Sequence, residues 1–114
     1  MGTNADTSTT KLKMDISDLK RSMTEARRQI RLANAEFKAS SAGIDNWAQS
    51  ADGLSAKMDQ LRNTLKAEKS ILSDLNKQYD LTVQSQGKNS KGAQELLIKI
   101  KNQEAAINKT KASL

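Results

Sequence analysis

The stretch ISDLKRSMTEARRQIRLANAEF, residues 16–37, decides the fold class of this 114-residue chain. Its apolar and small side chains recur at alternating spacings of three and four residues, at Ile16, Leu19, Met23, Ala26, Ile30, Ala33 and Phe37. This alternation is typical of the a and d positions of a coiled coil, because it keeps a narrow stripe on one side of the helix. Ser17 is a suitable N-cap, with Asp18 in the first turn. The pattern predicts an amphipathic helix over residues 17–41.

The residues before this helix carry weaker signals. Leu12, Met14 and Ile16 alternate with charged residues, so a short strand over residues 12–16 is a possible alternative. The first ten residues, MGTNADTSTT, are polar and lack the apolar core of a signal peptide. We expect residues 1–10 to be a disordered polar lead and residues 11–114 to be a single helical domain.

A second stripe follows Gly53 and predicts a helix over residues 52–86. Its members are again spaced by four and three residues: Leu54, Met58, Leu61, Leu65, Glu68, Leu72, Leu75, Tyr79 and Thr82. The polar members Glu68 and Thr82 weaken packing but can fix the register of the helices. Ile71, Leu81 and Val83 lie off this stripe and are expected to cover a third helix.

The break SQGKNSKG, residues 85–92, separates the second predicted helix from a third helix, which we predict over residues 90–114. Gly87 suits a helix C-cap, and Asn89 or Ser90 suits the next N-cap. Two registers overlap in this helix, one through Ala93, Leu97 and Ile100 and one through Leu96, Ile100 and Gln103. Short connections favour antiparallel neighbours, so we predict an all-α fold of two to three long amphipathic helices in a helical hairpin or coiled coil. The predicted packing seam consists of Ile16, Leu19, Met23, Ile30, Phe37, Leu54, Met58, Leu61, Leu65, Leu72, Leu75, Tyr79, Leu97, Ile100 and Ile107.

The only tryptophan, Trp47, lies in the break GIDNWAQSADGL, residues 43–54. Gly43 can end the first helix and Asp52 can help to start the second. An aromatic side chain of this size can close the end of a hairpin whose seam is built from Ala, Met and Leu. Trp47 is therefore expected to be a corner anchor, with a binding hot spot as the alternative.

The composition argues against catalysis. The chain has no cysteine and no histidine, which excludes thiolate nucleophiles, the common zinc sites and the usual acid–base side chain. It has no glycine-rich phosphate loop either. We therefore expect no enzyme activity, no catalytic residue, no metal, no cofactor and no small-molecule substrate.

No apolar run reaches the roughly 20 residues of a membrane span. The net charge is +6, but no aromatic residues interleave with the basic ones for base stacking, so nucleic acid is not the expected partner.

Four stretches together resemble the N-terminal region of tail tape measure proteins from long-tailed phages and prophages of Gram-positive bacteria. They are KMDISDLKRSMTEARRQI (13–30), LANAEFKAS (32–40), GIDNWAQSADGL (43–54) and GKNSKGAQELLIKIKNQEAAINKT (87–110). The resemblance covers residues 11–114 and lies in the order of these stretches, since none of them is a chemical motif.

The resemblance implies a structural role. Tape measure proteins are long helical rods that template tail-tube assembly and set tail length. It implies self-association, the tail tube protein and tail assembly chaperones as partners, and a location in the tube lumen of the virion tail after assembly in the host cytoplasm. It also implies that this chain is an N-terminal fragment of a longer protein.

Two alternatives remain open at the level of sequence. Small secreted helical-hairpin proteins of the Trp-x-Gly type also place a tryptophan in the turn of an α-hairpin. Here the turn reads Trp47-Ala48-Gln49, so the glycine of that motif is missing. The second alternative is a basic helical protein associated with nucleic acid, which the net charge permits without specifying.

Overall fold

The structure, a computed structural model, describes residues 2–44 and 46–114, with side chains from residue 15 onward. Over these residues the chain forms α1 (Gly2–Ser41), a short 3₁₀ turn η1 (Trp47–Gln49), α2 (Ala51–Gln86) and α3 (Lys91–Ser113). The prediction of an all-α helical hairpin is confirmed, and no strand occurs in the described part of the chain.

The start of α1 differs from the sequence expectation. The short strand considered over residues 12–16 is wrong, because these residues lie inside α1. Residues 2–10, expected as a disordered lead, are also helical, and residue 1 lies outside the described residues. Ser17 is therefore an interior residue of α1 and no N-cap. The physical reason is that a short alternating run cannot form a strand without a neighbouring strand to pair with.

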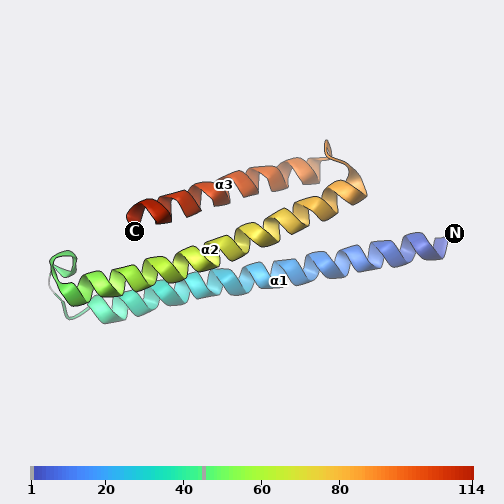
Figure 1. Ribbon diagram of the computed structural model, residues 1–114. Helices are drawn as coiled ribbons and strands as arrows, with labels where there is room; N and C mark the ends of the chain where they lie inside the picture. The colour runs from blue at the N-terminus through green and yellow to red at the C-terminus, as the bar shows by residue number, and fades with distance from the viewer. Residues whose placement is uncertain (1, 45) are drawn as a thin grey trace.

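The three helices form a slender body with α2 between its neighbours (Figure 1). α1 and α3 each run antiparallel to α2 and pack along it, while the contact between α1 and α3 is slight. The Cα atoms extend over 67 × 22 × 15 Å. Each helix can therefore bury only one or two stripes of side chains, and α2 buries the most.

The hydrophobic core is correspondingly narrow and is built largely from small and medium-sized side chains. Its buried members are Met23 and Ala26 of α1, Ala67, Ile71 and Leu75 of α2, and Leu96 and Ile100 of α3, with Ile30, Leu72 and Tyr79 packed at its edge. All three helices contribute to this one cluster. The described residues of the three helices thus share one hydrophobic cluster.

Local capping explains where α2 and α3 begin and end. The Ser50 hydroxyl accepts a hydrogen bond from the Gly53 amide at 3.1 Å, and the Ser90 hydroxyl accepts one from the Ala93 amide at 3.2 Å. Ser90, one of the two predicted N-caps, is therefore the one used. Gly87 ends α2 with a φ of 92°, a left-handed conformation that favours glycine, and its amide donates to the Val83 carbonyl.

The interface between α2 and α3 contains a buried polar pair. Glu68 is 8% exposed, and its Oε1 accepts a hydrogen bond from the Thr110 hydroxyl at 2.5 Å. Gln103 of α3 donates to the backbone carbonyl of Glu68 at 3.0 Å. These bonds pin α3 to one position along α2, which is the registry role expected for a polar seam residue.

Glu68→Leu is expected to raise the stability of the chain by about 1 kcal/mol, because apolar packing would replace a buried carboxylate. The Thr110 hydroxyl keeps a partner in the variant, since it also lies 3.1 Å from the Ala106 carbonyl. Thermal unfolding followed by circular dichroism measures the effect, with the exposed Glu104→Leu as the control. A lower melting temperature for Glu68→Leu would show that the hydrogen bond to Thr110 outweighs the cost of burying the carboxylate.

Candidate helix-docking surfaces

The predicted packing seam divides into three groups in the structure. Met23, Leu75, Ile100 and Ile107 are buried. Eight members are half-buried: Ile16, Leu19, Ile30, Phe37, Leu61, Leu65, Leu72 and Tyr79. Leu54, Met58 and Leu97 are 46%, 39% and 43% exposed, so these three do not belong to the buried seam.

The three exposed residues have separate physical reasons. Leu54 and Met58 lie near the start of α2, whereas the residues that α2 buries, apart from Gly53, fall between Ala67 and Thr82. Leu97 is exposed because the face that α3 buries takes members from both registers together with Thr110, and leaves Leu97 outside it: the buried residues are Ala93, Leu96, Ile100, Ile107 and Thr110. The sequence pattern did not show which members of the two registers would be buried.

α2 carries two buried stripes, and the sequence analysis found only one of them. Glu68 and Thr82, members of the predicted stripe, contact α3 through Thr110 and Gly92. The neighbouring stripe includes Ala67 and Ile71, and it packs toward α1 near the Asn34–Gln60 hydrogen bond of 2.7 Å. The signal that could have revealed it is the spacing of four residues from Ala67 to Ile71 and from Ile71 to Leu75, a residue of the predicted stripe.

Of the residues expected to cover a third helix, Leu81 lies toward α1 instead, whereas Ile71 shares a buried cluster with that helix. Leu81 borders a hollow together with Leu19 of α1. Ile71 lies in the common cluster that Met23 of α1 and Leu96 of α3 share. A residue off the predicted stripe therefore occupies the centre of the core.

The corner between α1 and α2 is held by an aromatic pair. The Phe37 and Trp47 rings meet edge to face, with centroids 5.1 Å apart. The Lys57 ammonium lies 4.8 Å from the Phe37 centroid and 5.8 Å from that of Trp47, within the range of cation–π attraction. Asn46 enters the turn with a positive φ of 54°, which asparagine tolerates better than most residues. Trp47 is half-buried and contacts the first helix, as an anchor of the corner would.

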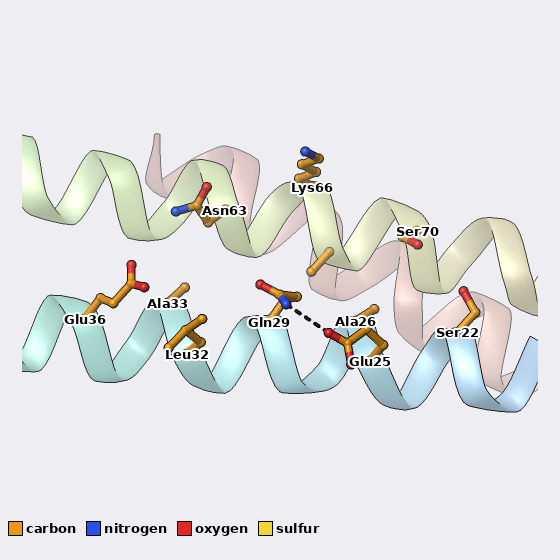
Figure 2. A pocket seen from close by; sticks show the side chains of 11 residues that line it. Ser22, Glu25, Ala26, Gln29, Leu32, Ala33, Glu36, Asn63, Lys66 and Ser70 are labelled. Atoms are coloured by element: carbon orange, nitrogen blue, oxygen red, sulfur yellow. Dashed lines mark hydrogen bonds between the residues drawn. The ribbon is translucent and has the colours of Figure 1, made fainter.

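A groove runs along one side of the α1–α2 pair and was not foreseen from the sequence. Figure 2 labels most of the side chains that line one part of it. This hollow has a volume of about 460 Å³, and its lining includes the small side chains of Ala26, Ala33 and Ala67. Its remaining lining consists of Ser22, Glu25, Gln29, Leu32 and Glu36 of α1 with Asn63, Lys66 and Ser70 of α2. A second hollow of about 450 Å³ is lined by Asp15, Asp18, Leu19, Lys77, Asp80 and Leu81.

Both hollows belong to one face of the helix pair. Their outer lining residues on α1 are Asp15, Asp18, Ser22, Glu25, Gln29, Leu32 and Glu36, which are spaced alternately by three and four residues. Such spacing places side chains along a single line of a helix. We call the two hollows together the α1–α2 groove.

The α1–α2 groove is acidic, although the chain as a whole is basic. Five carboxylates line it, from Asp15, Asp18, Glu25, Glu36 and Asp80, against the two lysines Lys66 and Lys77. The other flank of α1 carries Lys20, Arg27, Arg31 and Lys38, all exposed. Four carboxylates of α1 therefore face the groove and four basic residues lie on its other flank, while Arg21 and Arg28 lie beside the groove carboxylates with which they pair.

The rim charges are held by local contacts within α1. Gln29 donates a hydrogen bond to Glu25 at 3.1 Å, and Arg28 pairs with the same carboxylate at 2.8 Å. The bond from Gln29, followed by that from Arg28, lowers the pKa of Glu25 below its usual value. Glu25 therefore carries its charge throughout the neutral pH range. Asp18 is paired with Arg21 in the same way.

Comparison with known proteins gives no assignment, since no protein-family model, no curated protein and no solved structure matches the chain. Within the described residues, no group of three or more carboxylates has the arrangement of a metal site. None of the helices described is long and apolar enough to cross a bilayer. The features that remain for a functional interpretation are helix surfaces: the seam, the corner and the α1–α2 groove.

Proposed function

We propose that this chain is the N-terminal region of a tail tape measure protein, a structural segment that helps to set the length of a phage tail and templates assembly of the tail tube. The observation that carries the proposal is the ordered resemblance over residues 11–114. The slender all-helical body supports it, because a molecular ruler needs a shape that is long in one direction and regular along it.

Helix geometry supplies the physical basis of a ruler. An α-helix rises by about 1.5 Å per residue, so length is encoded directly in residue number. The folded body is 67 Å long. Laid end to end, α1, α2 and α3 would reach about 150 Å. The segment can therefore contribute either of these two lengths to the ruler. The shorter length applies if the hairpin stays closed inside the tail, and the longer one applies if it opens.

The narrow core fits such a role. Its buried side chains include several alanines and four polar residues, Glu68, Asp74, Thr82 and Thr110. A seam of this kind buries less apolar surface than one built from leucine and isoleucine, so opening it is less costly. In this proposal the exposed helix faces contact the tail tube protein and tail assembly chaperones. These contacts begin during assembly in the host cytoplasm, and the chain then lies in the tube lumen.

Insertion of six heptads into α1 and six into α2, beside the corner, tests the proposal in a phage that encodes this chain. If the hairpin stays closed, the two inserts lie side by side, and electron microscopy should show tails that are longer by about 63 Å. If the hairpin opens, the inserts lie end to end, and the tails should be longer by about 126 Å. An insert of the same length that is rich in glycine and forms no helix is the control, because it adds the same number of residues without adding helix length. Tails of unchanged length with the helical inserts would contradict a ruler function for this segment.

A further inference from the structure

The α1–α2 groove has the dimensions of a helix-binding site. From Asp15 to Glu36 its α1 rim extends for about 32 Å, the length of a helix of some 21 residues. The hollow nearer the corner is lined by small side chains, Ala26 and Ala33 from α1 and Ala67 from α2, over which a further helix backbone can approach closely. The second hollow is lined by the larger apolar side chains Leu19 and Leu81. Helices recognise such grooves through apolar residues at helical spacing.

The outward face of α3 has the complementary shape and charge. Ile98 is 61% exposed, the highest value among the large apolar side chains described as exposed. Ala105 continues the stripe one heptad further, and it is also exposed. Lys91, Lys101 and Lys109 surround this stripe. α3 as a whole carries five lysines against two glutamates, so it is the basic counterpart of the acidic groove.

We propose that α3 of one copy of this chain docks into the α1–α2 groove of a second copy. The spacing of the charges supports this pairing. Lys91, Lys101 and Lys109 span 18 residues, and Glu36, Glu25 and Asp18 also span 18 residues of α1.

Matching these charges fixes the orientation of the docked helix. Lys109 lies opposite Asp18, Lys101 opposite Glu25 and Lys91 opposite Glu36, which makes α3 antiparallel to the α1 that receives it. Ile98 then falls between Ala26 and Ala33, over the hollow shown in Figure 2. The largest apolar side chain of the α3 face thus meets the smallest side chains of the groove.

The geometry makes the contact heterologous, with different surfaces of the two copies in contact. The groove opens on one side of the α1–α2 pair, and α3 passes behind that pair when the groove is viewed from the front (Figure 2). A single copy therefore offers its groove to one neighbour and its α3 face to another. A contact of this type continues from copy to copy into a row, unless its rotation closes a ring. This assembly does not depend on the proposed tail function.

The charges on the groove set the conditions under which the row forms. Asp18 and Glu25 already pair with Arg21 and Arg28, but all four side chains are more than half exposed, and such pairs contribute little. Lys66 and Lys77 lie on the α2 rim and oppose a lysine-bearing helix. Association should therefore be weak, dependent on protein concentration and weakened by salt.

Sedimentation velocity of the purified chain tests the proposal with two blocked variants. Glu25→Lys with Glu36→Lys reverses the rim and blocks the groove, while Ile98→Glu places a carboxylate on the α3 face, where the acidic groove repels it, and so blocks that face. Each variant alone should stay at the monomer mass of 12.5 kDa at concentrations where the unmodified chain forms a ladder of species. An equal mixture of the two should stop at the heterodimer, because one intact groove and one intact α3 face remain.

Matched controls separate docking from folding and from general charge effects. Arg27→Glu with Lys38→Glu reverses two charges on the other flank of α1, and Leu114→Glu adds a carboxylate at another exposed apolar position of the same chain. Both should leave the ladder of species unchanged, and circular dichroism should show the same helix content in every variant.

Three results would overturn the proposal: a monomer at all concentrations in low salt, a ladder that survives both blocked variants, or a mixture that contains no heterodimer. A discrete dimer of the unmodified chain would also overturn it, since that points to a two-fold contact. Binding of a basic helix from another protein in the groove of a strictly monomeric chain would assign the site to a different partner.

Discussion

Gly53→Ala is expected to destabilise the chain by about 2–3 kcal/mol, although alanine is normally the better residue in a helix. A Cβ atom at residue 53 would lie 2.3 Å from the Trp47 carbonyl oxygen, 2.7 Å from its Cβ and 2.8 Å from its carbonyl carbon. Two of these three atoms belong to the backbone, so no side-chain rotation relieves the clash. The first turn of α2 would have to move away from Trp47.

The same movement would disturb contacts that close the hairpin. Ser50 would lose its capping bond to the Gly53 amide, and Trp47 would shift against Phe37. We therefore expect a lower melting temperature together with altered tryptophan fluorescence, which reports only Trp47 because the chain has no other tryptophan.

Gly92→Ala is the matched control, because Gly92 also lies in the first turn of a helix. Its new Cβ would meet the Gln86 Oε1 atom at 3.2 Å and the Thr82 Cγ2 atom at 3.5 Å, and the nearer of these is the end of a flexible side chain. The change should be close to neutral or slightly stabilising. An equal loss of stability in both variants would refute the packing argument at the corner.

The sequence was sufficient to predict three helices and the limits of α2 and α3 to within one residue, because these signals are local, but it did not predict that α1 includes residues 2–16. Heptad spacing indicated the amphipathic faces, and Gly87 and Ser90 marked the boundary between α2 and α3 correctly. Trp47 was recognised as a corner residue because it is the one large aromatic in a break. Its dependence on Gly53 was not foreseen, since the clash involves backbone atoms of η1 that only the folded turn brings near.

Features that depend on the third dimension escaped the sequence analysis. A single heptad stripe describes a helix with one partner, whereas α2 has two, so the second stripe through Ala67 and Ile71 was missed. Asp74 lies on α2 as well, and it is only 6% exposed, with an Oδ2 atom that has no hydrogen-bond partner in the described structure. A charged residue in a heptad sequence is ordinarily read as exposed, so its burial could not be anticipated.

The groove was missed for a related reason. Its residues are small or charged, and both kinds normally indicate a solvated helix flank. Only the pairing of α1 with α2 aligns the two flanks and reveals that five carboxylates share one face. Surfaces made from two helices are therefore the part of such a protein that sequence patterns predict least well.

Ile71→Ala should destabilise the chain by about 2–4 kcal/mol, the range for removing a branched side chain from a packed core. Ile71 is 4% exposed and lies in the cluster to which Met23 of α1 and Leu96 of α3 also belong. Its truncation therefore removes contacts within both helix pairs at once. Urea unfolding followed by circular dichroism at a helix wavelength measures the loss.

Leu54→Ala provides the comparison that tests the register of α2. Leu54 belongs to the heptad stripe predicted from the sequence and Ile71 does not, yet Leu54 is 46% exposed. If the two-stripe arrangement is right, Leu54→Ala should change the free energy of unfolding by less than about 1 kcal/mol, as surface substitutions usually do. A reversal, with the larger loss at Leu54, would mean that in solution α2 is turned about its axis and presents the predicted stripe to its neighbours.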